Sequence, residues 1–435
     1  MFVSLDTLYA CFRQSSCVTT DSRHCPQGSL FVALRGTNFD GNAYAAKALE
    51  AGSRWALIDN EAYLPAGDAR YLLTDNCLLT LQLLARMHRR RMKARVIGIT
   101  GTNGKTTTKE LLSAVLKTRY RVLHTEGNLN NQIGVPLTLL RMTEADEVAV
   151  VEMGASHPGD IRELVEIAEP DCGLITNVGK AHLQGFGSVE GVARTKGELY
   201  DFLRTRAGSM VFVDSGQERL LRMSEGLNRV CYGCRADDFV CGRILDGGPY
   251  LSFEWTCNAT DGRPHVVTTQ LIGNYNLSNA LAAVAVGNWL KVDAEELSAA
   301  IARYEPSNGR SQLKRTARNT LVVDAYNANP TSMRASIDNF LRLQAGEKML
   351  ILGDMRELGA DSRAEHQAIV DYLSACGLTH VVLVGTEFAA THHAFAHFDD
   401  VTALSQALSA NPPCGKTILI KGSNGVRLQS IVDKL

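Results

Sequence analysis

A glycine-rich segment at residues 97–108 constrains the fold more than any other part of the sequence. An apolar run at 94–99 leads into it, and a helical pattern from Lys109 to Thr118 follows it. This order predicts a buried strand, a tight loop and the N-terminus of a helix. Gly101 and Gly104 permit backbone angles and close approaches that a Cβ atom would block. The amide groups of such a loop and the helix dipole can then face an anion.

The two residues after Gly104 make this loop a phosphate site. Lys105 supplies a point charge for β- and γ-phosphates, and the hydroxyl of Thr106 suits Mg²⁺. Ile99 stands where the common phosphate loop has its first glycine, so the loop is a variant. It predicts a chain that binds ATP or GTP and cleaves it. The expected nucleotide-binding residues of the loop are Gly101, Thr102, Asn103, Gly104, Lys105, Thr106 and Thr107.

Length and charge restrict the remaining possibilities. A chain of 435 residues exceeds one ordinary core, so two or three domains are expected. The net charge of −1 gives no general attraction to nucleic acid or to anionic membranes. The sequence has no apolar stretch long enough to span a membrane and no signal-peptide pattern at its start, so a cytoplasmic protein without membrane insertion is expected. The 11 cysteines are expected to be reduced core thiols, and a zinc site at Cys231, Cys234 and Cys241 is not favoured.

The alternation of patterns predicts three α/β domains. Residues 1–92 form a small α/β domain, and the basic stretch His88–Arg91 is a plausible linker or a solvated helix end. Residues 93–303 form a central, doubly wound parallel sheet around the phosphate loop. Residues 304–435 form a second Rossmann-like unit that ends in a helix. Further strands are expected at 29–34, 55–58, 147–152, 172–177, 210–213, 250–255, 266–271, 320–324, 349–353, 381–385 and 417–421, and helices at 5–12, 43–51, 159–168, 189–203, 276–290, 332–343 and 363–376.

Polar residues follow several of these strands. Glu152 ends one strand and His182 follows the next, and a carboxylate at such an edge near a phosphate loop is a typical Mg²⁺ ligand. Asp324 ends the first strand of the third block. A loop rich in amides contains Asn128 and Asn131, and it is either a set of turns or a surface that hydrogen-bonds a sugar or a peptide. The segment after Asp324, which contains Tyr326, Asn327 and Asn329, has the same two interpretations.

Taken together, these motifs resemble the Mur ligase family and its folylpolyglutamate synthase relatives. The loop at 98–107 resembles the nucleotide loop of that family. The resemblance extends over all three blocks, and some segments are typical of the members that add a dipeptide. These segments are Thr125-Glu-Gly-Asn-Leu-Asn-Asn131, Glu152-Met-Gly-Ala-Ser156, Ala181-His-Leu-Gln-Gly-Phe-Gly187, Tyr326-Asn-Ala-Asn-Pro330 and Lys421-Gly-Ser423.

The resemblance implies roles for the domains and for particular residues. It implies an N-terminal domain that binds a UDP-sugar, a central domain that binds ATP, and a C-terminal domain that helps to bind ATP and the incoming dipeptide. It places Thr106, Glu152 and His182 at Mg²⁺-associated positions, and Lys196 where several relatives have a carbamylated lysine. The remaining implied contacts are Thr20, Asp21, Ser22, Arg23 and Arg35 for the UDP-sugar, Asn276 and Asn279 near adenine, Arg310 and Asp324 near the nucleotide, Ser156 within a matched motif, and Asn327, Asn329 and Ser423 for the dipeptide.

The implied reaction is the ATP-dependent joining of D-alanyl-D-alanine to UDP-N-acetylmuramoyl-tripeptide through an acyl phosphate, by a monomer that contains Mg²⁺. Because a carboxylate must approach a triphosphate, Lys105, Arg310 and Mg²⁺ are expected to dominate the site. Three alternatives stay open: a Mur-type ligase that adds diaminopimelate or lysine, a folylpolyglutamate synthase-like ligase, and a nucleotide-sensing switch without catalysis. The Asn-Ala-Asn-Pro segment favours the dipeptide.

Overall fold

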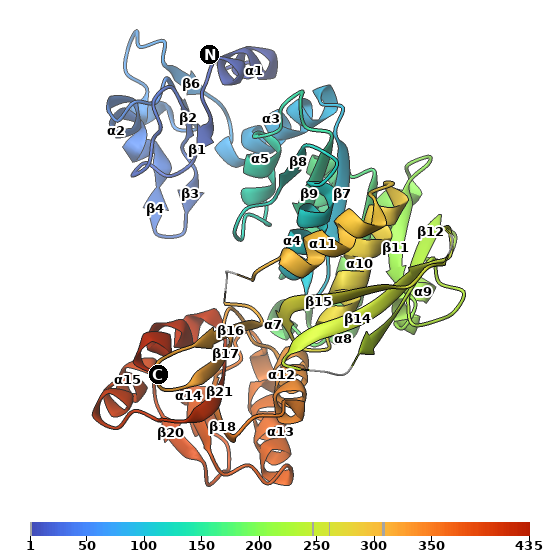
Figure 1. The fold of residues 1–435 in the computed structure, drawn as a ribbon. Helices are drawn as coiled ribbons and strands as arrows, with labels where there is room; N and C mark the ends of the chain where they lie inside the picture. Colours follow the sequence, from blue (N-terminus) through green and yellow to red (C-terminus); the bar gives the residue numbers. More distant parts are fainter. Residues whose placement is uncertain (1, 246–247, 261, 307–308) are drawn as a thin grey trace.

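The computed structural model describes residues 2–245, 248–260, 262–306 and 309–435. Its chain forms three α/β units, with the N-terminal unit at one end and the C-terminal unit at the other (Figure 1). The predicted fold class is confirmed: there are three α/β domains, and the central one contains the doubly wound sheet. Within the described residues, no helix is both long enough and apolar enough to cross a membrane.

The N-terminal unit is a small parallel sheet of strand order β1-β2-β5-β6 with a separate β3–β4 hairpin. Short apolar strands such as β5 are buried because helices cover the sheet. Its elements are α1 (Leu5–Arg13), β1 (Val18–Thr19), β2 (Leu30–Val32), β3 (Arg35–Gly36), β4 (Phe39–Asp40), η1 (Gly41–Tyr44), α2 (Ala45–Glu50), β5 (Trp55–Ile58), η2 (Glu61–Tyr63) and β6 (Tyr71–Leu73).

Of the two interpretations of the basic stretch His88–Arg91, the linker is wrong and the helix end is confirmed, although His88 and Arg89 are buried and only Arg90 and Arg91 are exposed. The stretch forms the last turn of α3 (Cys77–Arg91), a helix that packs against α5 (Gly134–Leu139) and α6 (Asp160–Ala168) of the central unit. His88 is buried, and its ring hydrogen-bonds Tyr9 of α1 and the carbonyl of Met142. Arg89 is also buried and pairs with Asp171 at 2.8 Å. These partners lie far away in the sequence, which is why a local pattern of charges did not reveal them.

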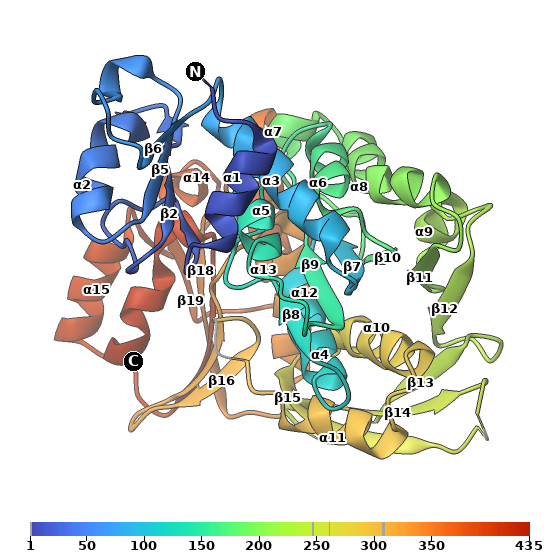
Figure 2. The same ribbon diagram turned by 90° about the horizontal axis from the view of Figure 1, so that it is seen from above.

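The central unit has a nine-stranded sheet of order β15-β14-β13-β12-β11-β10-β7-β9-β8. Its strands are parallel from β8 to β13, and β14 and β15 extend the sheet with antiparallel pairings. Helices α4, α10 and α11 cover one face, and α5, α6 and α8 cover the other (Figure 2). The elements are β7 (Arg95–Thr100), α4 (Lys105–Leu116), β8 (Val122–His124), α5 (Gly134–Leu139), β9 (Val148–Glu152), α6 (Asp160–Ala168), β10 (Cys172–Ile175), α7 (Leu183–Phe186), α8 (Val189–Arg204), β11 (Met210–Asp214), α9 (Glu218–Met223), β12 (Arg229–Gly233), β13 (Val240–Leu245), β14 (Tyr250–Cys257), β15 (His265–Ile272), α10 (Asn276–Trp289) and α11 (Ala294–Arg303).

The C-terminal unit is a six-stranded sheet of order β16-β17-β21-β18-β19-β20, in which β16 alone is antiparallel to its neighbour. The predicted final helix is a 3₁₀ helix, η5, instead of an α-helix. The elements are β16 (Gln312–Arg315), β17 (Thr320–Asp324), α12 (Pro330–Arg342), β18 (Glu347–Gly353), η3 (Gly359–Asp361), α13 (Ser362–Ala375), β19 (Val381–Val384), α14 (Thr386–Ala389), β20 (Ala396–Phe398), α15 (Val401–Ala410), β21 (Lys416–Lys421), η4 (Asn424–Val426) and η5 (Leu428–Lys434).

Apolar contacts join neighbouring units. One buried cluster runs from the N-terminal sheet through α3 to the central sheet, and another joins Leu183 and Phe186 of α7 to the core beneath α12 and α13. The expected domain boundaries, 92/93 and 303/304, stay predictions. The contacts place the carboxyl ends of the central strands opposite those of the C-terminal sheet.

Candidate active site

A cavity of about 820 Å³ lies between the central and C-terminal units. It opens where parallel strands end, the usual position of ligand sites in such sheets. The phosphate loop, the end of β9, the start of α10 and the loop after β17 all contribute to its wall. The predicted site residues that line it are Thr102, Asn103, Gly104, Lys105, Thr106, Thr107, Asn128, Asn131, Glu152, Ser156, His182, Asn276, Asn279, Arg310, Asp324, Tyr326, Asn327 and Asn329.

Some predicted residues lie outside this cavity wall. Lys196 is buried within α8, and Gly101 is buried at the base of the phosphate loop. Ser423 is buried too, and its hydroxyl donates to the Ala328 carbonyl and accepts from the Arg356 amide. The five residues expected to bind the UDP-sugar belong to the N-terminal unit, and their role stays a prediction. They are Thr20, Asp21, Ser22, Arg23 and Arg35; Arg23 pairs with Asp21 at 2.9 Å and Arg35 with Asp59 at 2.9 Å.

The phosphate loop has the backbone that its glycines predict. Gly101 has φ 143° and Gly104 has φ 81°, both in the region that side chains rarely adopt. A Cβ atom on Gly101 would overlap Thr176, and one on Gly104 would overlap Asn279. Gly104 is also the N-cap of α4 and offers no side-chain cap, so the first amide groups of the helix face the cavity without that partner. This is an anion site built from backbone.

The ammonium of Lys105 lies inside the loop. Its Nζ donates to the Gly101 carbonyl at 2.7 Å and to the Thr102 carbonyl at 3.1 Å. Burial of the ammonium lowers the pKa of Lys105 to about 8. The negative charge of Glu152 opposes this shift, and the positive charge of Arg310 adds to it. A polyphosphate bound at the loop would stabilise the protonated form and raise this pKa again.

The shifted pKa predicts how nucleotide affinity depends on pH. Below about pH 8 Lys105 is already protonated and affinity should be constant; above it, binding must take up a proton, so affinity should fall by up to about tenfold per pH unit. Calorimetric titration with ADP between about pH 7 and about pH 9.5 measures this dependence. In Lys105→Met the dependence should disappear, and if it persists, another group causes it.

Glu152 has the environment of a cation ligand. It is 1% exposed, and its Oε1 accepts from Thr106 Oγ1 at 3.2 Å and from Asn130 Nδ2 at 2.8 Å. Its Oε2 is buried, and within the described part of the chain no donor reaches it. No group of three or more acidic, histidine or cysteine side chains that could hold a metal was found among the described residues. Mg²⁺ commonly uses one or two carboxylates together with substrate phosphates, so Glu152 and Thr106 fit this ion.

His182 lines the cavity and connects two units. Its Nδ1 lies 2.5 Å from Oε2 of Glu357 in the C-terminal unit, and this contact holds the pKa of Glu357 below its usual range. The Phe186 ring lies 6.2 Å from the His182 ring and 5.5 Å from the ammonium of Lys196. Burial, and then the charge of Lys105, lower the pKa of Lys196 well below its ordinary value. Lys196 is therefore a buried amine behind the cavity wall, whereas a helix lysine is ordinarily solvent-exposed.

The two asparagines expected near adenine make bonds within the protein. Asn276 Nδ2 donates to the Ile272 carbonyl at 2.9 Å and to Ser311 Oγ at 3.2 Å. Asn279 Nδ2 donates to Asn276 Oδ1 at 2.9 Å, and its own oxygen accepts from Thr108 at 3.1 Å. These bonds connect the start of α10 with α4 and with the C-terminal unit. An adenine contact for either residue stays a prediction.

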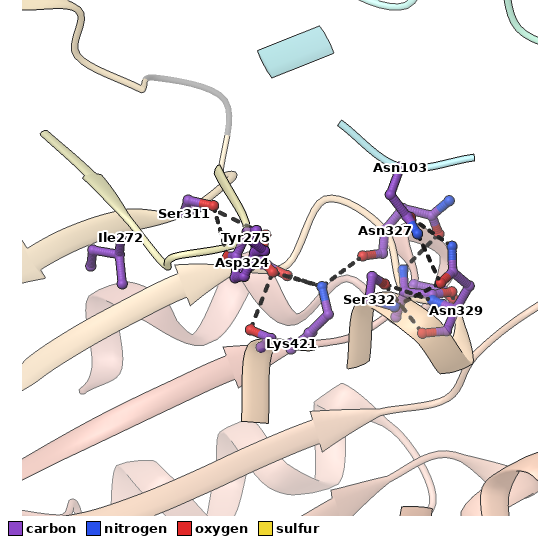
Figure 3. A network of polar contacts seen from close by, with 12 residues as sticks. Asn103, Ile272, Tyr275, Ser311, Asp324, Asn327, Asn329, Ser332 and Lys421 are labelled. Carbon is purple, nitrogen blue, oxygen red and sulfur yellow. Dashed lines mark hydrogen bonds and ion pairs between the residues drawn. The ribbon is translucent and has the colours of Figure 1, made fainter. Parts of the chain in front are cut away.

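On the C-terminal side, a stacked pair and an ion pair face the cavity. The guanidinium of Arg310 lies 3.7 Å from the Tyr326 ring centroid, and its buried Nε has no partner among the residues described. Asp324 accepts from Lys421 Nζ at 2.7 Å, and Lys421 also donates to the Asn327 carbonyl at 3.3 Å (Figure 3). Arg310 is thus a stacked cation in the cavity wall, and its Nε–H has no partner among the described residues.

Among the residues of the site that sequence reasoning did not select, Asn130 and Lys421 each hold a selected carboxylate. Asn130 orients Glu152 from the amide-rich loop, in which the outer asparagines alone were chosen. Lys421 fixes Asp324 from a strand end, and the Lys-Gly-Ser motif together with that position was the available signal. In both cases the partner lies in a distant part of the sequence.

Comparisons with known proteins agree with this architecture. Family models match residues 14–125 ("Mur ligase family, catalytic domain"), 99–287 ("Mur ligase middle domain") and 309–424 ("Mur ligase, glutamate ligase domain"). The UDP-N-acetylmuramoyl-tripeptide--D-alanyl-D-alanine ligase of Bacillus subtilis is 36% identical over 430 residues, covering 96% of this chain and 92% of the relative. The chain belongs to the Mur ligase family.

Solved structures of Mur ligases share the whole arrangement. A crystal structure of MurF from Acinetobacter baumannii superposes with a TM-score of 0.85 at 28% identity, covering 99% of this chain and 98% of that one. MurF ligase from Thermotoga maritima, crystallised in complex with ADP, gives a TM-score of 0.84 at 27% identity and covers 97% of both chains. The similarity of this Mur ligase to both structures therefore includes all three units.

Proposed function

We propose that this chain joins D-alanyl-D-alanine to the carboxyl end of UDP-N-acetylmuramoyl-tripeptide, with ATP as the energy source, in peptidoglycan precursor synthesis. The observation that carries the proposal is the uncapped start of α4, which faces a cavity shared with Lys105 and Glu152. The name of the Bacillus subtilis relative and the ADP in the Thermotoga maritima structure support it. The Tyr326-to-Pro330 segment, present at the cavity, favours the dipeptide over a single amino acid.

Two displacements make up the reaction. First, an oxygen of the tripeptide carboxylate forms a bond to the γ-phosphorus while the bond from that phosphorus to the β-phosphate oxygen breaks, which gives an acyl phosphate and ADP. The dipeptide amine then bonds to the acyl carbon, the carbon–oxygen bond to phosphate breaks, and the amine loses its proton. Two unit charges about 4 Å apart repel by roughly 4 kcal/mol at an effective dielectric of 20. Lys105 and Arg310 offset this repulsion at the first step.

Mg²⁺ is a further part of the proposal. Thr106 and Glu152 would hold it, with His182 and a carbamate on Lys196 as additional proposed ligands. Bound there, the ion would supply positive charge against the phosphate oxygens. The protein's own contribution is to fix the Glu152 carboxylate: Thr106 and Asn130 donate to one of its oxygens and leave the other free.

The roles of the remaining residues are part of the proposal and rest on the family resemblance. We assign Thr20, Asp21, Ser22, Arg23 and Arg35 to the UDP-sugar, and Asn128, Asn131 and Ser156 to the tripeptide side of the cavity. Asn276, Asn279, Asp324 and Tyr326 are assigned to the nucleotide, and the loop with Asn327 and Asn329, with Ser423 behind it, to the dipeptide side. We further propose a cytoplasmic monomer with domains 1–92, 93–303 and 304–435.

Phosphate release tests the proposal directly. With ATP, Mg²⁺ and UDP-N-acetylmuramoyl-tripeptide, D-alanyl-D-alanine should stimulate release, whereas diaminopimelate, lysine or glutamate should not. If a single amino acid stimulated phosphate release instead, the chain would be a ligase that adds that amino acid. Nucleotide binding without phosphate release for any acceptor would favour a switch.

A further inference from the structure

A pair of side-chain amides joins the phosphate loop to the C-terminal unit. Asn329 Nδ2 donates to Asn103 Oδ1 at 2.8 Å, and Asn103 Nδ2 lies 3.5 Å from Asn329 Oδ1 (Figure 3). Asn103 precedes the N-cap glycine of α4, and Asn329 begins α12. Asn329 is 8% exposed, so water competes little for this contact. The two residues are 226 positions apart in the sequence.

Hydrogen bonds with neighbouring residues hold the backbone of Asn103 in place. The Asn103 amide donates to Asn177 Oδ1 at 2.9 Å, and its carbonyl accepts from Asn177 Nδ2 at 2.9 Å and from Thr176 Oγ1 at 2.6 Å. These bonds determine where the Asn103 side chain can point. A residue that engages this side chain therefore acts on the segment that holds Gly104 and Lys105.

The Asn329 side is equally constrained. The side-chain oxygen Oδ1 of Asn329 accepts from the backbone amide of Ser332 at 2.9 Å. The backbone amide of Asn329 donates to Ser332 Oγ at 3.1 Å, and the two bonds form a complete capping box. The preceding loop is held by Lys421, which binds Asp324 and the Asn327 carbonyl. The carboxamide oxygen of Asn329 is thus committed to the helix, and one of its two N–H donors is committed to Asn103.

We propose that Asn329 is a positioning residue that docks the dipeptide-side loop on the phosphate loop through Asn103. Its own side chain does not bind the dipeptide; it sets the distance between the loop that carries Asn327 and the bound acyl phosphate. The inference depends on the proposed ligase function. It changes the role assigned to Asn329 from substrate contact to coupling between the two loops.

Serine substitutions separate this role from helix capping. Serine is a good N-cap but is too short to reach across to Asn103, so Asn329→Ser should keep α12 and lose the contact. Since one neutral hydrogen bond is lost, we expect kcat/KM for D-alanyl-D-alanine to fall about tenfold. The dissociation constant for ADP should change less than about twofold. Ser332→Ala, which weakens the capping box and leaves the amide pair, is the matched control and should stay near the parent.

A double-mutant cycle decides the coupling. Asn103→Ser should also lower kcat/KM for the dipeptide, and the double variant should be no worse than the more damaged single variant. Multiplicative losses would overturn the proposal, because Asn329 would then act on the dipeptide independently of Asn103. A loss in Ser332→Ala as large as in Asn329→Ser would also overturn it, in favour of helix capping alone.

Small-angle scattering provides a readout without turnover. With ADP bound, the parent and Ser332→Ala should be compact, whereas Asn329→Ser and Asn103→Ser should both be more extended. Identical profiles for all four would contradict the docking role. If the parent released no phosphate with the dipeptide, the proposed function would fail, and scattering would still decide whether Asn329 docks the two units.

Discussion

Replacing Lys105 with alanine should lower turnover by about a hundred- to a thousandfold, which corresponds to roughly 2.7–4 kcal/mol of transition-state stabilisation. The reason is that the first step brings a carboxylate onto a triphosphate, and the Lys105 ammonium, which hydrogen-bonds the Gly101 and Thr102 carbonyls, supplies positive charge within the loop. Because removing that side chain leaves the Gly104-to-Thr107 amides in place, nucleotide affinity should fall less than turnover. Steady-state phosphate release and ADP titration on the same samples measure both.

Lys117→Ala is the control for this experiment. Lys117 caps the other end of α4 and is exposed, so the same charge is removed from the same helix away from the cavity. It should keep parent activity and the parent melting temperature. Near-normal ATP cleavage in Lys105→Ala would remove Lys105 from the reaction and would weaken the whole assignment of the site.

Replacing Lys196 with alanine should also be severe, with turnover lower by about a hundredfold. Burial and the charge of Lys105 depress the pKa of Lys196, so a larger fraction of this amine is neutral than in an exposed lysine. A neutral amine can attack CO₂: a nitrogen–carbon bond forms, a proton is released, and the product is a carbamate anion. Such an anion would replace a repelling cation with an oxygen ligand. Activity should accordingly rise with bicarbonate in the parent.

Chemical rescue distinguishes the carbamate from a packing role. Formate or acetate should restore part of the activity of Lys196→Ala, because the cavity left by the side chain can hold a small carboxylate. Arg194→Ala, an exposed change on the same helix, should need no rescue. Full activity in Lys196→Ala without added acid would end the carbamate hypothesis, and loss without rescue would leave only a structural role for the lysine.

Predictions from sequence succeeded where the signal was local. The phosphate loop depends on consecutive residues, and the strand ends at Glu152 and Asp324 were found from apolar runs a few residues long. Predictions failed where the partner was distant. For the basic end of α3, sequence left a linker and a solvated helix end open and missed the burial of His88 and Arg89, because their contacts lie in other units.

The same limit applies to the amide residues. The family resemblance assigned Asn276 and Asn279 to adenine and Asn329 to the dipeptide, but the sequence did not show which protein groups each of them contacts. In the structure, each of the three makes a side-chain hydrogen bond to another element: Asn276 to Ser311, Asn279 to Thr108 and Asn329 to Asn103. Sequence reasoning did not select Asn130 or Lys421. In the structure, Asn130 orients the carboxylate of Glu152, and Lys421 orients that of Asp324.

The amino-acid sequence by itself determined the three α/β units, the family and the phosphate loop, because glycine conformations, apolar periodicity and helix starts depend on neighbouring residues. Only the tertiary structure decided that Lys196 is buried behind the cavity, that His182 pairs with Glu357, and that Asn103 meets Asn329. Those facts depend on how two sheets face each other. Burial and electrostatic environment are properties of that packing, and no stretch of sequence contains them.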